Sequence, residues 1–216
     1  MGGAGGKPLR RLGLALSWTN GVILGESGEE YRGTMTEQRK RIQSRIAWGI
    51  TGAGHFLSSC LDILLALNQA DVFLSKAARE VLPSYGLFEK LKKSQHPIFL
   101  DTSAGSRPVT KLYTGEYKLV VIAPVTSNSI AKMASGIADN LITNLFAHAG
   151  KCKIPTILLP CDFQPEINSL TPRGDQVLVH ARKIDLENIN RLASWPGVTL
   201  AADPEQLKSY LHTFLI

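Results

Sequence analysis

The apolar residues of the chain fall into short runs that alternate with longer amphipathic segments. Runs rich in β-branched residues and too short for helices predict strands at 45–50, 71–74, 98–100, 119–123, 154–159, 177–179 and 198–200. Apolar residues at three- and four-residue steps predict helices at 55–68, 77–82, 88–93 and 185–193, with a last helix from Pro204. Residues 165–175 are rich in turn formers and predict a loop. The alternation predicts a single α/β domain with a doubly wound, Rossmann- or flavodoxin-like, mostly parallel sheet.

The strongest pattern lies at residues 119–142. An apolar run is followed by Pro124, which has no N–H and is expected to end the strand. One amphipathic helix is expected next, with its apolar positions at Ile130, Met133, Ala134, Ile137 and Leu141. Between them lie four small polar residues, Thr126, Ser127, Asn128 and Ser129. A helix cap needs only one such residue, so four at the C-terminal end of a buried strand favour a ligand site.

The first expected strand is followed by Gly52-Ala53-Gly54 and then by a helix. Glycines let the backbone approach a phosphate, and the helix start supplies N–H donors. The full GxGxxG fingerprint is absent because position 57 is Leu, which favours a mononucleotide over a dinucleotide. A plain tight turn is the alternative. His55, at the start of the helix, is either a capping or surface residue or a candidate catalytic group.

Two further strand ends carry polar groups. Ser75 and Lys76 follow the second expected strand, where they either bind a phosphate or cap and flank the next helix. Cys161 and Asp162 follow a later strand, where the thiol either faces a ligand or packs as an inert small residue. Because the ends of parallel strands meet at one sheet edge, the glycine turn, Ser75 and residues 126–129 are expected to converge.

Composition limits the classes of protein that the chain can belong to. The 216 residues are 44% hydrophobic and 19% charged, which is typical of a globular domain. No apolar run approaches the ~20 residues of a membrane span. Residues 1–45 hold eight Lys and Arg against four Glu, so they carry +4 of the net charge of +6. The remainder is nearly neutral, which disfavours nucleic-acid binding. The three cysteines lack CxxC spacing, so we expect a reducing, cytoplasmic location, no disulfide framework and no metal site.

Residues 1–44 do not match the alternating pattern. The segment opens with a glycine-rich stretch, and its apolar runs are short and broken. Arg10-Arg11 raises a targeting signal as an alternative, but no convincing cleavage site follows. We expect 1–44 to be a flexible or non-native extension, with Met35 as a natural start, and 45–216 to be the folded domain.

The stretch PVTSNSIAKMASGIADNLIT resembles the flavoprotein family of homo-oligomeric, flavin-containing Cys decarboxylase-like proteins. This family includes peptidyl-cysteine decarboxylases, phosphopantothenoylcysteine decarboxylase and flavin prenyltransferase. The matching positions are Pro124, Thr126, Asn128, Gly136, Ile137, Asp139, Asn140 and Leu141. The resemblance implies FMN, with its phosphate at Gly52–Gly54 and Ser75 and its ribityl chain and ring along Thr126–Ser129. It also implies trimeric building blocks with flavin between subunits. The full expected FMN set is Gly52, Ala53, Gly54, His55, Ser75, Lys76, Pro124, Thr126, Ser127, Asn128, Ser129 and Cys161.

Two departures from the family pattern disfavour decarboxylation. The Pro-x-Met-Asn motif is replaced by Pro160-Cys161-Asp162-Phe163, and residues 109–118 contain no His. The segments WGITGAGHFL and TPRGDQVLVHARKIDLENI look most like the B-type dihydromethanopterin reductases, which use FMN to reduce dihydromethanopterin to tetrahydromethanopterin in one-carbon metabolism. This resemblance implies an oxidoreductase, a dihydropterin substrate, and NAD(P)H or a ferredoxin-type protein as electron donor. Asp162, His55 and water are the candidate proton sources. The alternatives are a flavin prenyltransferase-like or decarboxylase-like protein and an FMN electron carrier.

Overall fold

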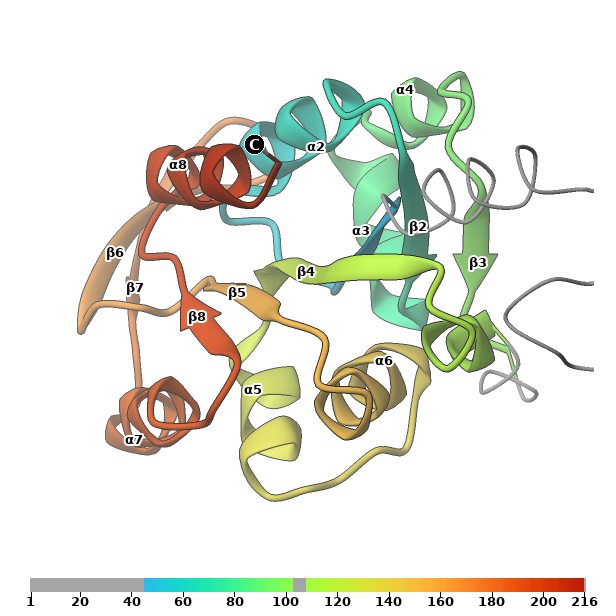
Figure 1. Ribbon diagram of the computed structural model, residues 1–216. Helices are drawn as coiled ribbons and strands as arrows, with labels where there is room; N and C mark the ends of the chain where they lie inside the picture. Colours follow the sequence, from blue (N-terminus) through green and yellow to red (C-terminus); the bar gives the residue numbers. More distant parts are fainter. Residues whose placement is uncertain (1–44, 103–107, 216) are drawn as a thin grey trace, which may run out of the picture. The chain divides into compact units, whose positions relative to one another are not determined.

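A six-stranded parallel sheet forms the centre of the computed structural model, which describes residues 45–102 and 108–215 (Figure 1). The strand order is β3-β2-β1-β4-β5-β8. The strands are β1 (Arg45–Ile50), β2 (Ala70–Leu74), β3 (Ile98–Leu100), β4 (Tyr117–Val125), β5 (Thr156–Pro160) and β8 (Val198–Leu200). From β1 the chain first builds outwards to β3 and then returns to β4 on the other side. The expected doubly wound fold is confirmed, and β1 and β4 form its switch point, where open α/β sheets bind ligands.

Helices cover both faces of this sheet (Figure 1). One face packs against α2 (Leu57–Leu65), α3 (Lys76–Ser84), α4 (Phe88–Lys92) and α8 (Pro204–Leu215). The other packs against η1 (Pro108–Leu112), α5 (Ser127–Ala134), α6 (Leu141–Lys151) and α7 (Lys183–Ala193). Alternate residues of β1 divide between the two cores: Ile46 and Trp48 lie in the first, Ala47 in the second. This alternation follows from the two-residue period of a strand.

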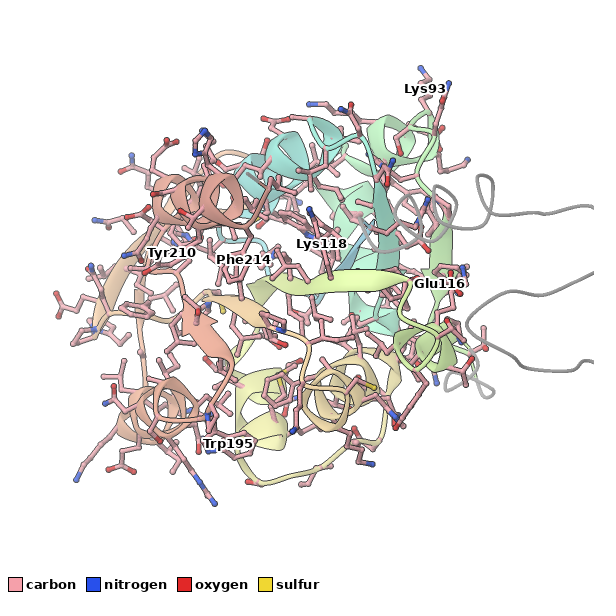
Figure 2. The ribbon with its side chains drawn as sticks, viewed as in Figure 1. Lys93, Glu116, Lys118, Trp195, Tyr210 and Phe214 are labelled. Carbon is pink, nitrogen blue, oxygen red and sulfur yellow. The ribbon has the colours of Figure 1, made fainter. Side chains whose placement is uncertain are left out.

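The continuous apolar runs reflect burial on both faces of the sheet. Every residue of β2 and β5 is buried, as parallel strands between two helical layers require. The Trp48 indole is also fully buried, and its Nε1–H donates to the Ala123 carbonyl at 2.9 Å. At the edge of the second core, Trp195 packs against Phe146 with 6.0 Å between ring centroids (Figure 2).

The strand β4 continues past the proline that was expected to end it. It runs to Val125, and its register with β5 shifts between Ile122 and Val125. Pro124 lies within this irregular stretch, where the regular ladder is interrupted and a missing N–H is tolerated. Its carbonyl accepts hydrogen bonds from the Thr51 amide (3.2 Å) and hydroxyl (3.0 Å). The proline therefore does not stop the strand.

The single helix expected after residue 129 is two helices. The first, α5, ends at Ala134, and Gly136 follows with φ +74°. The Ile137 amide donates to Lys132 and the Gly136 amide to Met133, the hydrogen-bond pattern of a Schellman cap. Asn140 then caps α6 through a capping box with Thr143. Ile137 is consequently 47% exposed, and Leu141 belongs to the second helix.

The loop expected at 165–175 is largely a β-strand. The strand β6 (Glu166–Leu170) pairs antiparallel with β7 (Gln176–His180) in a separate two-stranded ribbon. The connecting turn is closed by the Thr171 amide donating to the Asp175 carbonyl at 2.9 Å. The sequence did not predict β6 because none of its residues is buried and only alternate ones are partly shielded from solvent. Polar residues therefore occupy much of the strand, and the alternation of apolar and polar residues typical of a strand is not visible. Smaller errors are at helix ends: α2 begins at Leu57, and α3 continues through Pro83 to Ser84.

Candidate functional site

A cavity of about 500 Å³ opens at the carboxyl edge of the sheet. It lies beside the switch point, because its walls include the loop after β1 and the start of α5, which follows β4. The loop after β5 and the β6–β7 ribbon complete it. The expected residues that it brings together are Gly52, Ala53, Gly54, His55, Thr126, Ser127, Asn128, Cys161 and Asp162. The predicted convergence of the glycine turn with the start of α5 is therefore observed.

The glycine turn packs too closely for side chains. A Cβ on Gly52 would lie 2.5 Å from the Ala77 Cβ, and one on Gly54 would lie 2.0 Å from the Tyr85 hydroxyl. Both glycines are thus required by contact with α3 and the turn after it. Thr51 connects this turn to the next loop, since its hydroxyl donates to Pro124 and accepts from the Thr126 amide at 2.8 Å. The two loops form one hydrogen-bonded wall.

The start of α5 supplies the polar groups of that wall. Thr126 is the N-cap, and its hydroxyl oxygen accepts from the Ser129 amide at 3.3 Å. The first N–H groups of a helix have no intrahelical partner and favour a negatively charged ligand. Among the described residues, the Asn128 side chain has no hydrogen-bond partner, and it is exposed at the cavity. Its amide is therefore free to recognise a ligand.

Four of the expected residues do not line the cavity. They are Ser75, Lys76, Pro124 and Ser129. The Ser75 hydroxyl caps α3 by accepting from the Ala78 amide at 3.0 Å, which is the alternative that the sequence left open. Lys76 is exposed and Pro124 is buried. The Ser129 hydroxyl lies 3.1 Å from that of Thr126, within the helix cap. A role for these four in binding a ligand stays a prediction.

The loop after β5 contributes a carboxylate and a thiol. The Ser127 hydroxyl donates a short hydrogen bond to Asp162. Burial, reinforced by the Asp162 charge, raises the pKa of Cys161 to about 12. The thiol is therefore protonated at neutral pH and is not a nucleophile. The pKa of His55 is lowered by burial, and the Asp162 carboxylate partly opposes that shift.

The opposite wall of the cavity was not predicted. Tyr85 lines it and donates from its hydroxyl to the Leu170 carbonyl at 3.0 Å, which joins the end of α3 to the ribbon. The ribbon turns one face to the cavity, with Ile167, Ser169, Val177 and Val179. The apolar run at 177–179 predicted the strand β7, but nothing local identifies Tyr85. One sequence feature is connected with the position of Tyr85. Residue 54 is a glycine, and the absence of a side chain there leaves room for the Tyr85 hydroxyl.

Neither a metal-binding cluster nor a helix able to span a membrane is present within 45–102 and 108–215. No group of three or more His, Cys, Asp or Glu side chains in these ranges is arranged to hold a metal ion. Likewise, no helix in the same ranges is both long and apolar enough to cross a membrane.

The sequence pattern of the Flavoprotein family matches residues 34–211, and the chain belongs to this family. A protein of Methanocaldococcus jannaschii without a described function is 34% identical over 174 residues, which are 77% of this chain and 94% of that protein. The dihydromethanopterin reductase (acceptor) of Methanosarcina mazei is 38% identical over 141 residues. This chain spans 59% of the length of that reductase.

A solved structure is also similar along most of the chain. It is the complex of Burkholderia xenovorans DmrB with FMN, described as a cubic protein cage for redox transfer. The two chains are 42% identical, with a TM-score of 0.74, and the match covers 80% of this chain and 96% of DmrB. The family expected from the PVTSNS stretch is thereby confirmed. At 21% identity, the phenylacrylic acid decarboxylase of Aquifex aeolicus shares the fold alone.

Proposed function

We propose that this protein is an FMN-dependent oxidoreductase that reduces a dihydropterin, dihydromethanopterin, to its tetrahydro form. The observation that carries the proposal is the joint wall of Gly52–Gly54 and the start of α5 at the switch point. The likeness to DmrB, which was solved with FMN, and to a dihydromethanopterin reductase supports the cofactor and the substrate class.

The cavity fits FMN in size and chemistry. Its volume of about 500 Å³ lies within the range of small-molecule sites. Backbone N–H groups at the glycine turn and at the start of α5 suit a phosphate and polar ring edges. The apolar face of the ribbon suits a flat aromatic ring. Gly52–Gly54 and Thr126–Asn128 would hold the cofactor, while the Ser75 hydroxyl caps α3 and the Ser129 amide donates to Thr126, the N-cap of α5.

When bound, FMN supplies the hydride that reduces a C=N bond of the substrate. The chain's own residues orient the reactants and control the proton. Asn128 presents a free amide at the cavity. Ser127 is held by Asp162, which fixes the direction of its hydroxyl. The ribbon forms the opposite wall of the cavity. The Cys161 thiol stays protonated and takes no covalent part.

We further propose a homo-oligomer built from trimeric units. The description of DmrB as a cubic cage supports an assembly of identical chains. The electron donor is NAD(P)H or a ferredoxin-type protein. A cytoplasmic location is consistent with free cysteines at positions 60, 152 and 161.

The test starts from the purified full-length protein. Its absorption spectrum is recorded, and any chromophore is released and identified by mass. The reduced protein is then mixed anaerobically with dihydropterin, and reoxidation is followed at the flavin band. We expect bound FMN, selective reoxidation by dihydropterin and formation of the tetrahydropterin. Colourless protein that does not take up FMN would overturn the proposal.

Two other outcomes would replace the proposed reductase function with a different one. Equal oxidation by many unrelated acceptors would identify an electron carrier, and prenylated FMN formed from dimethylallyl phosphate would identify a prenyltransferase. The variant Asn128→Leu should weaken FMN binding about tenfold, because it removes a polar contact worth roughly 1.5 kcal/mol. Asn190→Leu is the matched control, since Asn190 is exposed on α7, away from the cavity.

A further inference from the structure

Four ionisable side chains line the cavity among the described residues: His55, Tyr85, Cys161 and Asp162. Two of them, Tyr85 and Cys161, are not available to transfer a proton to a substrate. The Tyr85 hydroxyl proton is donated to the Leu170 carbonyl at 3.0 Å. The Cys161 thiol is buried, and that burial raises its pKa to about 12. Only His55 and Asp162 are left to exchange protons with a bound substrate at neutral pH.

His55 is held at the cavity by a constrained backbone. The next residue, Phe56, has φ +63°, a left-handed conformation that is unusual for a bulky side chain. Such outliers persist where the surroundings impose them and are common at functional sites. The Phe56 ring lies against the imidazole, with 3.7 Å between centroids. The imidazole is thus fixed between the glycine turn and the start of α2.

Asp162 lines the same cavity from the loop after β5. Its carboxylate accepts the hydroxyl proton of Ser127, the first residue of α5. The carboxylate raises the pKa of His55, while burial lowers that pKa by more. Asp162 therefore stabilises the imidazolium that burial alone would disfavour.

We infer that His55 is the proton donor of the reaction and that Asp162, held by Ser127, is the carboxylate whose charge stabilises the protonated imidazole. This inference rests on the proposed reduction of a dihydropterin. The hydride from reduced FMN adds to the carbon of the C=N bond, and the π electrons move to the nitrogen. The nitrogen takes a proton from the His55 imidazolium and becomes N–H. His55 is left neutral and regains a proton from water, while the two electrons come from the donor that reduced the flavin.

The charges around His55 allow a direct test. From the turn after α3 it faces Tyr85, and from the loop after β5 it faces Cys161 and Asp162. The start of α5 and the cavity face of the ribbon contribute no charged side chain to the lining. Arg182 lies close enough to feel the Asp162 charge, but it is itself paired with Asp185 at 2.7 Å. Asp162 is accordingly the only carboxylate lining the cavity among the described residues.

The first experiment measures the His55 pKa by NMR of the full-length protein with labelled histidine. We expect a clear decrease in Asp162→Asn and a smaller one in Ser127→Ala. Asp175→Asn is the matched control, because Asp175 lies in the exposed turn of the ribbon, and it should leave the His55 pKa unchanged. If the His55 pKa is the same in wild type and Asp162→Asn, the Asp162 charge does not stabilise the His55 imidazolium. That result would overturn the inference whatever the substrate proves to be.

The second experiment measures reoxidation of the reduced protein by dihydropterin as a function of pH. We expect His55→Gln to slow this step about 10²-fold, and Asp162→Asn to move its pH dependence to lower pH. Imidazole added to His55→Ala should restore part of the rate. FMN content is measured in every variant: loss of FMN from His55→Gln would assign His55 to the cofactor and overturn the inference. A wild-type protein that reduces no dihydropterin would instead refute the proposed function, and the NMR titration would still decide on the pair.

Discussion

The cavity has two walls of very different construction. The sheet-edge wall consists of Gly52–Gly54 and Thr126–Asn128 and follows directly from the central strands β1 and β4. Thr51, which is 2% exposed, joins its two loops by hydrogen bonds. The ribbon wall is a two-stranded hairpin, in which every residue of β7 is exposed. The polar contacts of the site are thus built on the most buried part of the fold, and the apolar contacts on the least buried.

This difference predicts different functions for the two walls. A buried, hydrogen-bonded wall is preorganised and does not have to be ordered when a ligand binds. An isolated two-stranded hairpin is marginally stable in water, so we expect the ribbon to gain order when a flat ligand covers Val177 and Val179. The hydrogen bond from the Tyr85 hydroxyl to the Leu170 carbonyl links the ribbon wall to the rest of the fold. Substitutions at each wall should separate cofactor binding from ribbon order.

The largest effect is expected at Gly54, where the walls meet. Gly54→Val would place a Cβ 2.0 Å from the Tyr85 hydroxyl, so the tyrosine or the turn has to move. We expect loss of most FMN binding, by at least about tenfold, since the backbone of the turn is part of the proposed cofactor site. Flavin absorbance after gel filtration measures it.

Gly150→Ala is the control for that substitution. A Cβ at Gly150 meets no atom within 4 Å, and the residue lies in α6. The change should leave FMN binding intact and raise the free energy of unfolding by about 0.5–1 kcal/mol. Normal flavin content in Gly54→Val would show that the turn is not part of the binding wall.

The second effect tests the rigidity of the sheet-edge wall. Thr51→Val keeps the shape of the side chain but leaves the Thr126 amide without its acceptor. We expect the free energy of unfolding to fall by about 1–3 kcal/mol, the cost of an unsatisfied buried group. Urea unfolding followed by circular dichroism measures it. Thr213→Val, on the exposed side of α8, should stay within about 0.5 kcal/mol of wild type, and equal losses in both variants would contradict the explanation.

A smaller and local effect is expected for Tyr85→Phe. The substitution removes the hydrogen bond to Leu170, worth about 0.5–1.5 kcal/mol. Because few other contacts hold the ribbon, amide hydrogen exchange in 166–180 should become faster while exchange in β1 and β4 is unchanged. Tyr210→Phe on α8 serves as the control (Figure 2). Unchanged exchange in the ribbon would mean that other contacts fix it.

The smallest effect concerns pH. Burial lowers the pKa of His55 in the folded state below its ordinary value of 6.5. The unfolded chain therefore binds a proton more readily, and the stability from neutral His55 is present above pH 6.5 and lost as pH falls through the folded pKa. Thermal unfolding between pH 7 and pH 5 should decline less steeply in His55→Gln than in wild type. Parallel declines would exclude His55 as a contributor.

Much of the sheet and half of the site could be predicted from local patterns. The central strands are buried on both faces, so their apolar runs are continuous and visible in the sequence. The glycine turn and the polar cluster after β4 stand at strand ends, and parallel topology alone brings strand ends to one edge. For this reason the sheet-edge wall was identified residue by residue, together with Cys161 and Asp162.

What escaped prediction depends on contacts between distant segments. Pro124 continues a strand because a shift in register with β5 removes the need for its N–H. In the ribbon, β7 was predicted as a strand but β6 was not, because β6 has no buried residue and so no clear period. The place of the ribbon at the cavity follows from packing and the Tyr85 hydroxyl. For Ser75 the sequence left two roles open, and only the structure shows that its hydroxyl caps α3 by accepting from the Ala78 amide. Local composition decides which segments become strands and helices, whereas tertiary packing decides which side chains reach the ligand, since that depends on space and partners that no single segment contains.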